Sequence, residues 1–116
     1  MTHYDLSVWR RRSYPLPLYR PNDHQKKRPA VVVSSSTYNR ERQDLILVAV
    51  TSQLKSSGYF GDVIISQWQQ AGLIRPSVVK SIFTTVEKGL ALKKLGRLGQ
   101  DDRRALKETL EAVIGE

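Results

Sequence analysis

Cysteine is absent from this 116-residue chain, which excludes disulfide bonds and thiolate metal sites and permits a reducing compartment. Histidine is scarce as well. His3 and His24 are the two in the chain, and most carboxylates are isolated or clustered near the C-terminus, so no ligand set with metal-site spacing occurs. No glycine-rich phosphate loop is present either. We therefore expect neither a metal nor a cofactor.

Long apolar runs are also missing. None approaches the roughly 20 residues that a membrane-spanning helix needs. Arginines interrupt residues 1–18, where a secretory signal would have its apolar core. The expectation is a cytoplasmic protein that does not enter a membrane.

Acidic residues are scarce relative to basic ones. Lys and Arg number 19 against 11 Asp and Glu, which gives a formal net charge of +8 and a pI of about 10.1. The imbalance is concentrated in residues 1–28, where seven basic residues face two Asp. Such a chain attracts phosphate backbones or an acidic protein, although a merely soluble basic surface has the same composition.

The length and an apolar content of 40% fit a single domain, residues 1–116, with one modest core. Strands are expected at 5–9, 30–36, 44–51, 59–66, 73–83 and 94–98. Residues 38–42 are polar and turn-prone, so the strands on either side should form a β-hairpin. The runs 30–36 and 44–51 are almost continuously apolar, which is typical of strands buried on both faces, as in a small barrel.

A C-terminal helix is predicted from residues 99–102 onward. Its apolar residues at helical spacing are Leu106, Leu110, Val113 and Ile114. Acidic residues at 101 and 102 complement the helix dipole, and Gly115 is a suitable stop. Short helical turns are expected at 67–70 or 84–88. The expected fold is therefore mainly β with α, a small barrel closed by a C-terminal helix.

Residues 1–25 are atypical. Arg10, Arg11 and Arg12 follow directly on the strand expected at 5–9, and Pro15, Pro17 and Pro21 favour extended, non-helical chain. Three alternatives stay open: a disordered arm, a repositioned strand and a damaged start of the domain.

An arginine and a threonine stand at the ends of two neighbouring expected strands. Arg28 begins the first and Thr51 ends the second, so antiparallel pairing would bring the guanidinium and the hydroxyl together. A fixed cation beside a hydroxyl suits a phosphate group. Each residue also has a plainer interpretation, as a solvated charge and as a β-branched residue at a strand end.

The order of several segments resembles the MazF/PemK family of toxin ribonucleases over residues 26–115. The segments are Arg-Pro-Ala-Val-Val-Val-Ser from Arg28, Tyr38-Asn39, Thr51-Ser52-Gln53, Ala71-Gly72-Leu73-Ile74-Arg75-Pro76-Ser77-Val78-Val79-Lys80, and Lys94-Leu95-Gly96-Arg97-Leu98 before the helix. A Gly-Asp pair that opens the family's first strand is missing, and Pro15-Leu16-Pro17-Leu18 stands for a later Pro-Phe-Pro-Phe segment.

The resemblance implies an SH3-like barrel, as in CcdB and PemK, and the toxin of a type II toxin–antitoxin module. It implies sequence-selective, metal-independent cleavage of single-stranded RNA, chiefly messenger RNA, leaving a 2′,3′-cyclic phosphate. Arg28 matches the family's catalytic arginine and Thr51 its catalytic threonine. The implied partners are the RNA, an acidic antitoxin and a second copy of the chain.

Further residues are expected to contact RNA near this pair. They are Lys27, Ser52, Gln53, Tyr59, Arg75, Ser77 and Lys80. Some family members follow the arginine at position 75 with an aspartate two residues later. Serine stands there in this chain, and serine is no base near neutral pH without an activator. Asp23 and His24 precede Arg28, but nothing evident in the sequence orients the imidazole, so we favour a plain loop histidine.

Two rival functions keep the fold. One is a barrel that binds RNA or protein without cutting, which Ser77 and the atypical N-terminus favour. The other is a CcdB-like toxin that targets DNA gyrase and has no need of the Arg28–Thr51 pair.

Overall fold

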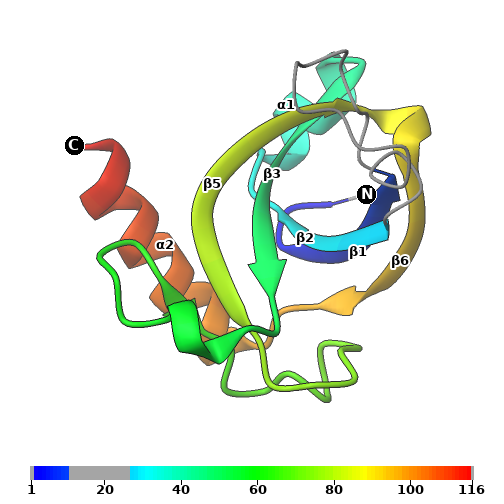
Figure 1. Cartoon of the computed structure of the whole chain (residues 1–116). Coiled ribbons are helices and arrows are strands. Elements are labelled where there is room, and N and C mark those ends of the chain that lie inside the picture. Colours follow the sequence, from blue (N-terminus) through cyan, green and yellow to red (C-terminus); the bar gives the residue numbers. More distant parts are fainter. Residues whose placement is uncertain (1, 11–26, 116) are drawn as a thin grey trace, which may run out of the picture.

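The computed structural model of the chain describes residues 2–10 and 27–115. Six antiparallel strands form one sheet in the order β4-β5-β3-β2-β1-β6. They are β1 (Asp5–Arg10), β2 (Lys27–Val32), β3 (Asp44–Thr51), β4 (Val63–Ile64), β5 (Val78–Glu87) and β6 (Ala91–Arg97). The sheet curls into a half-barrel, and α2 (Gln100–Ile114) crosses its outer side next to β4 and β5 (Figure 1). The expected mainly β fold with a C-terminal helix is confirmed.

β1 lies in the interior of the sheet, between β2 and β6. Its start is held by Asp5, whose carboxylate accepts hydrogen bonds from the Thr2 backbone N–H at 2.7 Å and from the Thr2 hydroxyl at 3.0 Å. Tyr4 takes a φ of 67°, a conformation that glycine adopts with less strain. The strand expected at 5–9 is therefore confirmed, and the first strand forms without the family's Gly-Asp pair. Asp23, His24 and the proline segment at 15–18 lie outside the described residues.

The predicted antiparallel pairing of the strands on either side of residues 38–42 is confirmed, but the turn predicted between them is wrong, because this segment is the helix α1 (Ser36–Glu41). Ser35 caps it, since its hydroxyl oxygen accepts from the Tyr38 N–H at 3.1 Å. Asn39, within this helix, has a buried side chain. Its amide NH₂ group donates to the Ser34 carbonyl, and its amide oxygen accepts from the Ser34 hydroxyl. The capping serine and this buried pair favour a helical turn, and β2 consequently ends at Val32, four residues earlier than expected.

Other strands also differ in extent from the prediction, and the one expected at 94–98 spans Ala91–Arg97. The strand expected at 59–66 is reduced to Val63–Ile64, and the one expected at 73–83 begins at Val78 and continues to Glu87. The helical turn expected at 84–88 is strand up to Glu87, followed by a 3₁₀ turn at Lys88–Leu90. β5 extends this far because it pairs along β3, from Val78 opposite Thr51 to Glu87 opposite Asp44. That pairing partner is not visible in the local sequence.

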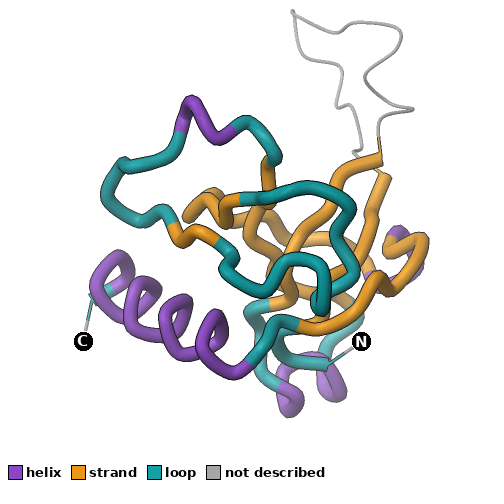
Figure 2. Tube along the Cα trace, turned by 90° about the horizontal axis from the view of Figure 1, so that it is seen from below, coloured by secondary structure: helices purple, strands orange, loops and turns teal. Residues whose placement is uncertain are grey.

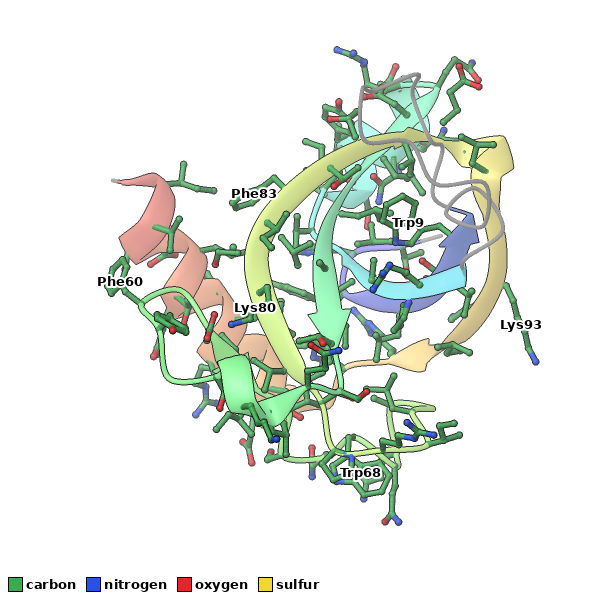
Figure 3. The ribbon with its side chains drawn as sticks, in the orientation of Figure 1. Trp9, Phe60, Trp68, Lys80, Phe83 and Lys93 are labelled. Atoms are coloured by element: carbon green, nitrogen blue, oxygen red, sulfur yellow. The ribbon has the colours of Figure 1, made fainter. Side chains whose placement is uncertain are left out.

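Apolar side chains fill both faces of β2 and β3. The first cluster packs beneath α2 and includes Val31, Val48 and Leu106. The second includes Ala30, Leu47 and Trp9, and Figure 3 shows Trp9 within the ring of strands. The prediction from the continuous apolar runs, that these strands are buried on both faces, is confirmed.

The C-terminal helix follows the prediction closely. α2 begins after Gly99 and ends before Gly115, which takes a φ of 100°. Leu106 is fully buried and Leu110 packs against the first cluster, whereas Ile114 is 68% exposed and lies beyond the core. Figure 2 shows the loop after β4 running beside the start of α2. Among the described helices, none has the length and apolar character that a membrane span requires.

Candidate functional site

An open pocket of about 430 Å³ lies where β2 begins and β3 ends. Three segments supply its walls: the start of β2, the end of β3 with the two residues after it, and the loop before β5. The lining residues are Arg28, Pro29, Val50, Thr51, Ser52, Gln53, Leu73, Ile74, Arg75 and Ser77. The pocket thus unites six of the nine residues that the sequence placed at the site.

Arg28 and Thr51 meet through the pairing of β2 with β3. The ladder sets Ala30 opposite Ala49 and Val32 opposite Leu47. Continued for two residues past Ala30, the same register would set Arg28 opposite Thr51, and residues opposite each other in an antiparallel pair point to the same side of the sheet. Both line the pocket. The structure thus brings both residues to one pocket, and the close approach of guanidinium and hydroxyl stays a prediction.

The hydroxyl of Thr51 has a defined orientation. Its oxygen accepts a hydrogen bond from the Gln53 backbone N–H at 3.1 Å, which closes a tight turn after β3. A hydroxyl that accepts one bond keeps its own proton for donation. Thr51 can therefore act as a donor toward a group bound in the pocket.

Arg75 and Ser77 line the pocket from the loop before β5. The Ser77 hydroxyl donates to the Arg75 carbonyl at 2.9 Å, and Ser77 is 4% exposed although it lines the pocket. Its proton is thereby engaged in holding the backbone of the loop. Arg75 itself is exposed, so it brings a second guanidinium to the lining of the pocket.

Two of the expected contact residues, Tyr59 and Lys80, are not among the described residues that line the pocket. Lys80 donates to Asp62 at 2.8 Å, and its ammonium lies 5.2 Å from the centre of the Tyr59 ring. Figure 3 shows Lys80 on the side of β5 that faces α2. The hydrogen bond from Lys80 lowers the pKa of the Asp62 carboxyl. The side chain of Lys27, another expected contact residue, lies outside the described part.

Four lining residues were not expected from the sequence: Pro29, Val50, Leu73 and Ile74. Pro29 and Val50 are neighbours of Arg28 and Thr51 and follow from them. Ile74 is an exposed apolar residue in a loop, and its place in the segment that leads to Arg75 was the available signal.

The described part of the lining carries two positive charges and no negative one. Such a pocket attracts anions, and two guanidinium groups with nearby hydroxyls suit the oxygens of a phosphate. Across residues 2–10 and 27–115, no three His, Asp or Glu side chains gather as metal ligands would.

Fold and pocket together define a small basic protein with a half-barrel sheet and an arginine-lined pocket. Residues 14–114 match the family model of the PemK-like, MazF-like toxins of type II toxin–antitoxin systems. The match spans most of the chain, so the protein belongs to this family. The resemblance found in the sequence is confirmed.

Several solved structures share the fold. An endoribonuclease in complex with its cognate antitoxin from Mycobacterial species has a TM-score of 0.73 and 14% identity over 98% of this chain and 94% of that one. Mycobacterium tuberculosis toxin MazF-mt6 has a TM-score of 0.73 and 16% identity, with 95% of each chain covered. MazF from Deinococcus radiodurans has a TM-score of 0.68 and 19% identity over 100% and 97%. No curated protein matches the chain.

Proposed function

We propose that this toxin is a metal-independent endoribonuclease that cuts single-stranded RNA at selected sequences. The observation that supports the proposal is that Arg28, at the start of β2, and Thr51, at the end of β3, both line one open pocket. Its volume of about 430 Å³ lies in the roughly 300–1,000 Å³ range of small-ligand sites, so an unpaired nucleotide is a suitable occupant.

The reaction is attack of a ribose 2′-oxygen on the adjacent phosphorus, with departure of the 5′-oxygen of the next nucleotide. Extra negative charge develops on the two non-bridging oxygens of a five-coordinate phosphorus. Arg28 stays protonated and its planar fork can donate to both oxygens, and the Thr51 hydroxyl adds a third donor. The products are a 2′,3′-cyclic phosphate and a 5′-hydroxyl.

Two protons must also move, one from the 2′-hydroxyl and one to the leaving oxygen. The described lining contains no carboxylate or imidazole, and the hydroxyl of Ser77 already donates to Arg75. We assign both proton transfers to water in the open pocket. To Arg75 we assign the binding of a neighbouring phosphate. Asp23 and His24 are the titratable residues nearest to Arg28 in sequence and lie outside the described part.

An acidic antitoxin is the proposed protein partner. The related mycobacterial endoribonuclease was solved with its cognate antitoxin, and MazF from Deinococcus radiodurans with MazE. A net charge of +8 and an arginine-lined pocket attract an acidic segment by the same electrostatics that attract RNA. Occupation of the pocket by such a segment would block the substrate.

A homodimer is proposed as the form in solution. Large apolar side chains are exposed on neighbouring parts of the molecule: Phe60 at 83% in the loop before β4, Phe83 at 40% on β5 and Ile114 at 68% on α2. Figure 3 shows Phe60 beside α2 and Phe83 on β5. A single small domain seldom leaves several large apolar side chains in water without a partner.

The test is cleavage of a long single-stranded RNA in EDTA, with the product ends mapped. Wild type should cut at a short recurring motif and leave 2′,3′-cyclic phosphate ends, and Arg28→Ala should not cut. Arg104→Ala is the matched control, because it removes the same charge from an exposed position on α2. Absence of cutting by folded wild type, with RNA still bound, would support the binding-only alternative. Toxicity that persists in Arg28→Ala would support a different target such as gyrase.

A further inference from the structure

Asp102 is a buried carboxylate that accepts hydrogen bonds from a segment far from it in sequence. It lies in the first turn of α2 and is 3% exposed. One carboxylate oxygen accepts from the Ser66 backbone N–H at 2.9 Å and from the Ser66 hydroxyl at 2.8 Å. The other accepts from the Gln67 N–H at 3.0 Å. All three donors belong to the chain that follows β4, and none to α2.

The segment that Asp102 holds is a compact helical turn. Its N–H groups at Ala71, Gly72 and Leu73 donate to carbonyls three to five residues earlier, at 3.0–3.1 Å. Asp102 therefore acts as the N-terminal cap of this turn, satisfying the first N–H groups, which have no partner within it.

The far end of the turn is wedged against β6. Gly72 has a φ of +94°, and a Cβ there would lie 2.2 Å from the Leu95 carbonyl oxygen. A Cβ on Gly96 would lie 2.3 Å from the Ala71 carbonyl oxygen. Both glycines allow a close backbone approach that side chains would prevent. The turn is thus fixed at its start by Asp102 and at its end by β6.

The residues directly after the turn form one wall of the pocket. Leu73, Ile74 and Arg75 all line it, and Ser77 holds the Arg75 carbonyl just before β5 begins. Arg75 therefore lies on a short span between two anchored points. Because the guanidinium is exposed, its location depends on this backbone span and not on packing of its own side chain.

We infer that Asp102 is a positioning residue for the RNA site: through the Ser66–Gly72 turn it sets the place of Arg75 in the lining of the pocket. The inference rests on the proposed ribonuclease function and adds to it a residue that does not line the pocket. It also links α2 mechanically to the substrate site.

Asp102→Asn is the sharpest change, because it keeps the shape and removes one acceptor. The amide oxygen can still accept from Ser66, but its NH₂ group would meet the Gln67 N–H, and two donors cannot bond each other. The turn should loosen while α2 stays folded. Asp101→Asn is the matched control, since it removes the same charge from an exposed position beside Asp102 in the first turn of α2.

The experiment is a double-mutant cycle on kcat/KM for RNA cleavage with Asp102→Asn, Arg75→Ala and the double variant. We expect about a tenfold loss for Asp102→Asn, because small misplacement of a binding group costs about this much or more. The double variant should match Arg75→Ala within about threefold, since both changes act on one element. Asp101→Asn should remain at the wild-type value.

Hydrogen exchange supplies a readout that does not depend on cutting. Amides of residues 66–77 should exchange faster in Asp102→Asn, with exchange in β2 and β3 unchanged. If Asp102→Asn does not fold, Ser66→Ala removes one of the three donors and should give a smaller loss, also absent in the Arg75→Ala background.

The results distinguish failure of the positioning role of Asp102 from failure of the proposed ribonuclease function. Losses that multiply in the double variant, or unchanged exchange at 66–77, overturn the positioning role and leave the ribonuclease intact. Absence of cutting by folded wild type overturns the proposed function and this inference together.

Discussion

Thr51→Val tests the site at its most specific point. Valine keeps the β-branched shape at the end of β3 and removes the hydroxyl alone. In wild type the hydroxyl oxygen accepts from the Gln53 N–H at 3.1 Å, so its own proton is available to the pocket. The substitution therefore removes one donor from the place where negative charge develops.

The expected effect is large on catalysis and small on stability. Removal of one preorganised donor to a developing oxyanion lowers kcat by about 10²–10³, or roughly 3–4 kcal/mol of transition-state stabilisation. The lost Gln53 hydrogen bond costs about 1 kcal/mol at most, because that residue is exposed and its N–H can bond water instead. Thermal unfolding should shift by a few degrees.

Single-turnover cleavage of a fluorescent RNA, with the protein in excess, measures the chemical step directly. Thr51→Ser is the control, because it restores the hydroxyl and the turn and should recover most of the rate. Cleavage by Thr51→Val within about threefold of wild type, at equal RNA binding, would refute the role of this hydroxyl.

Three further predictions concern stability. Gly72→Ala should cost about 3 kcal/mol or more in denaturant unfolding, from overpacking and a strained positive φ, whereas Gly89→Ala, with nothing within 4 Å of its Cβ, should stay within about 0.5 kcal/mol. Asn39→Ala should cost about 1–3 kcal/mol because it leaves buried polar groups unpaired, and an unchanged urea midpoint would contradict this. The Lys80 hydrogen bond lowers the pKa of Asp62, so its stabilisation is present above the unfolded pKa of about 3.9 and is lost as pH falls through the lower folded value. The difference in stability between wild type and Asp62→Asn should begin to shrink as pH falls below about 4, and a constant difference down to pH 2 would exclude the linkage.

Much of the fold follows from local patterns. β3 occupies the predicted residues 44–51, and α2 begins and ends where the glycines at 99 and 115 indicated. These elements carry their own signals, a continuous apolar run in one case and helical spacing with a glycine stop in the other. Sequence reasoning was less successful at 38–42, where a turn-prone composition fits a loop and a short helix equally well. The capping serine and the burial of Asn39 decide between them.

For the site, the sequence by itself determined which side chains are available and that Arg28 and Thr51 lie at the ends of neighbouring strands. Arg28 and Thr51 lie at the ends of adjacent strands, so their meeting requires only an antiparallel register. Tertiary structure alone decided the rest. It brought Arg75 into the lining of the pocket, left Lys80 paired with Asp62 outside the lining, and joined Asp102 to the turn at 66–72. The physical reason is that strand pattern is a local property of the chain, whereas these contacts join residues from distant elements and exist only once the sheet has curled and α2 has packed against it.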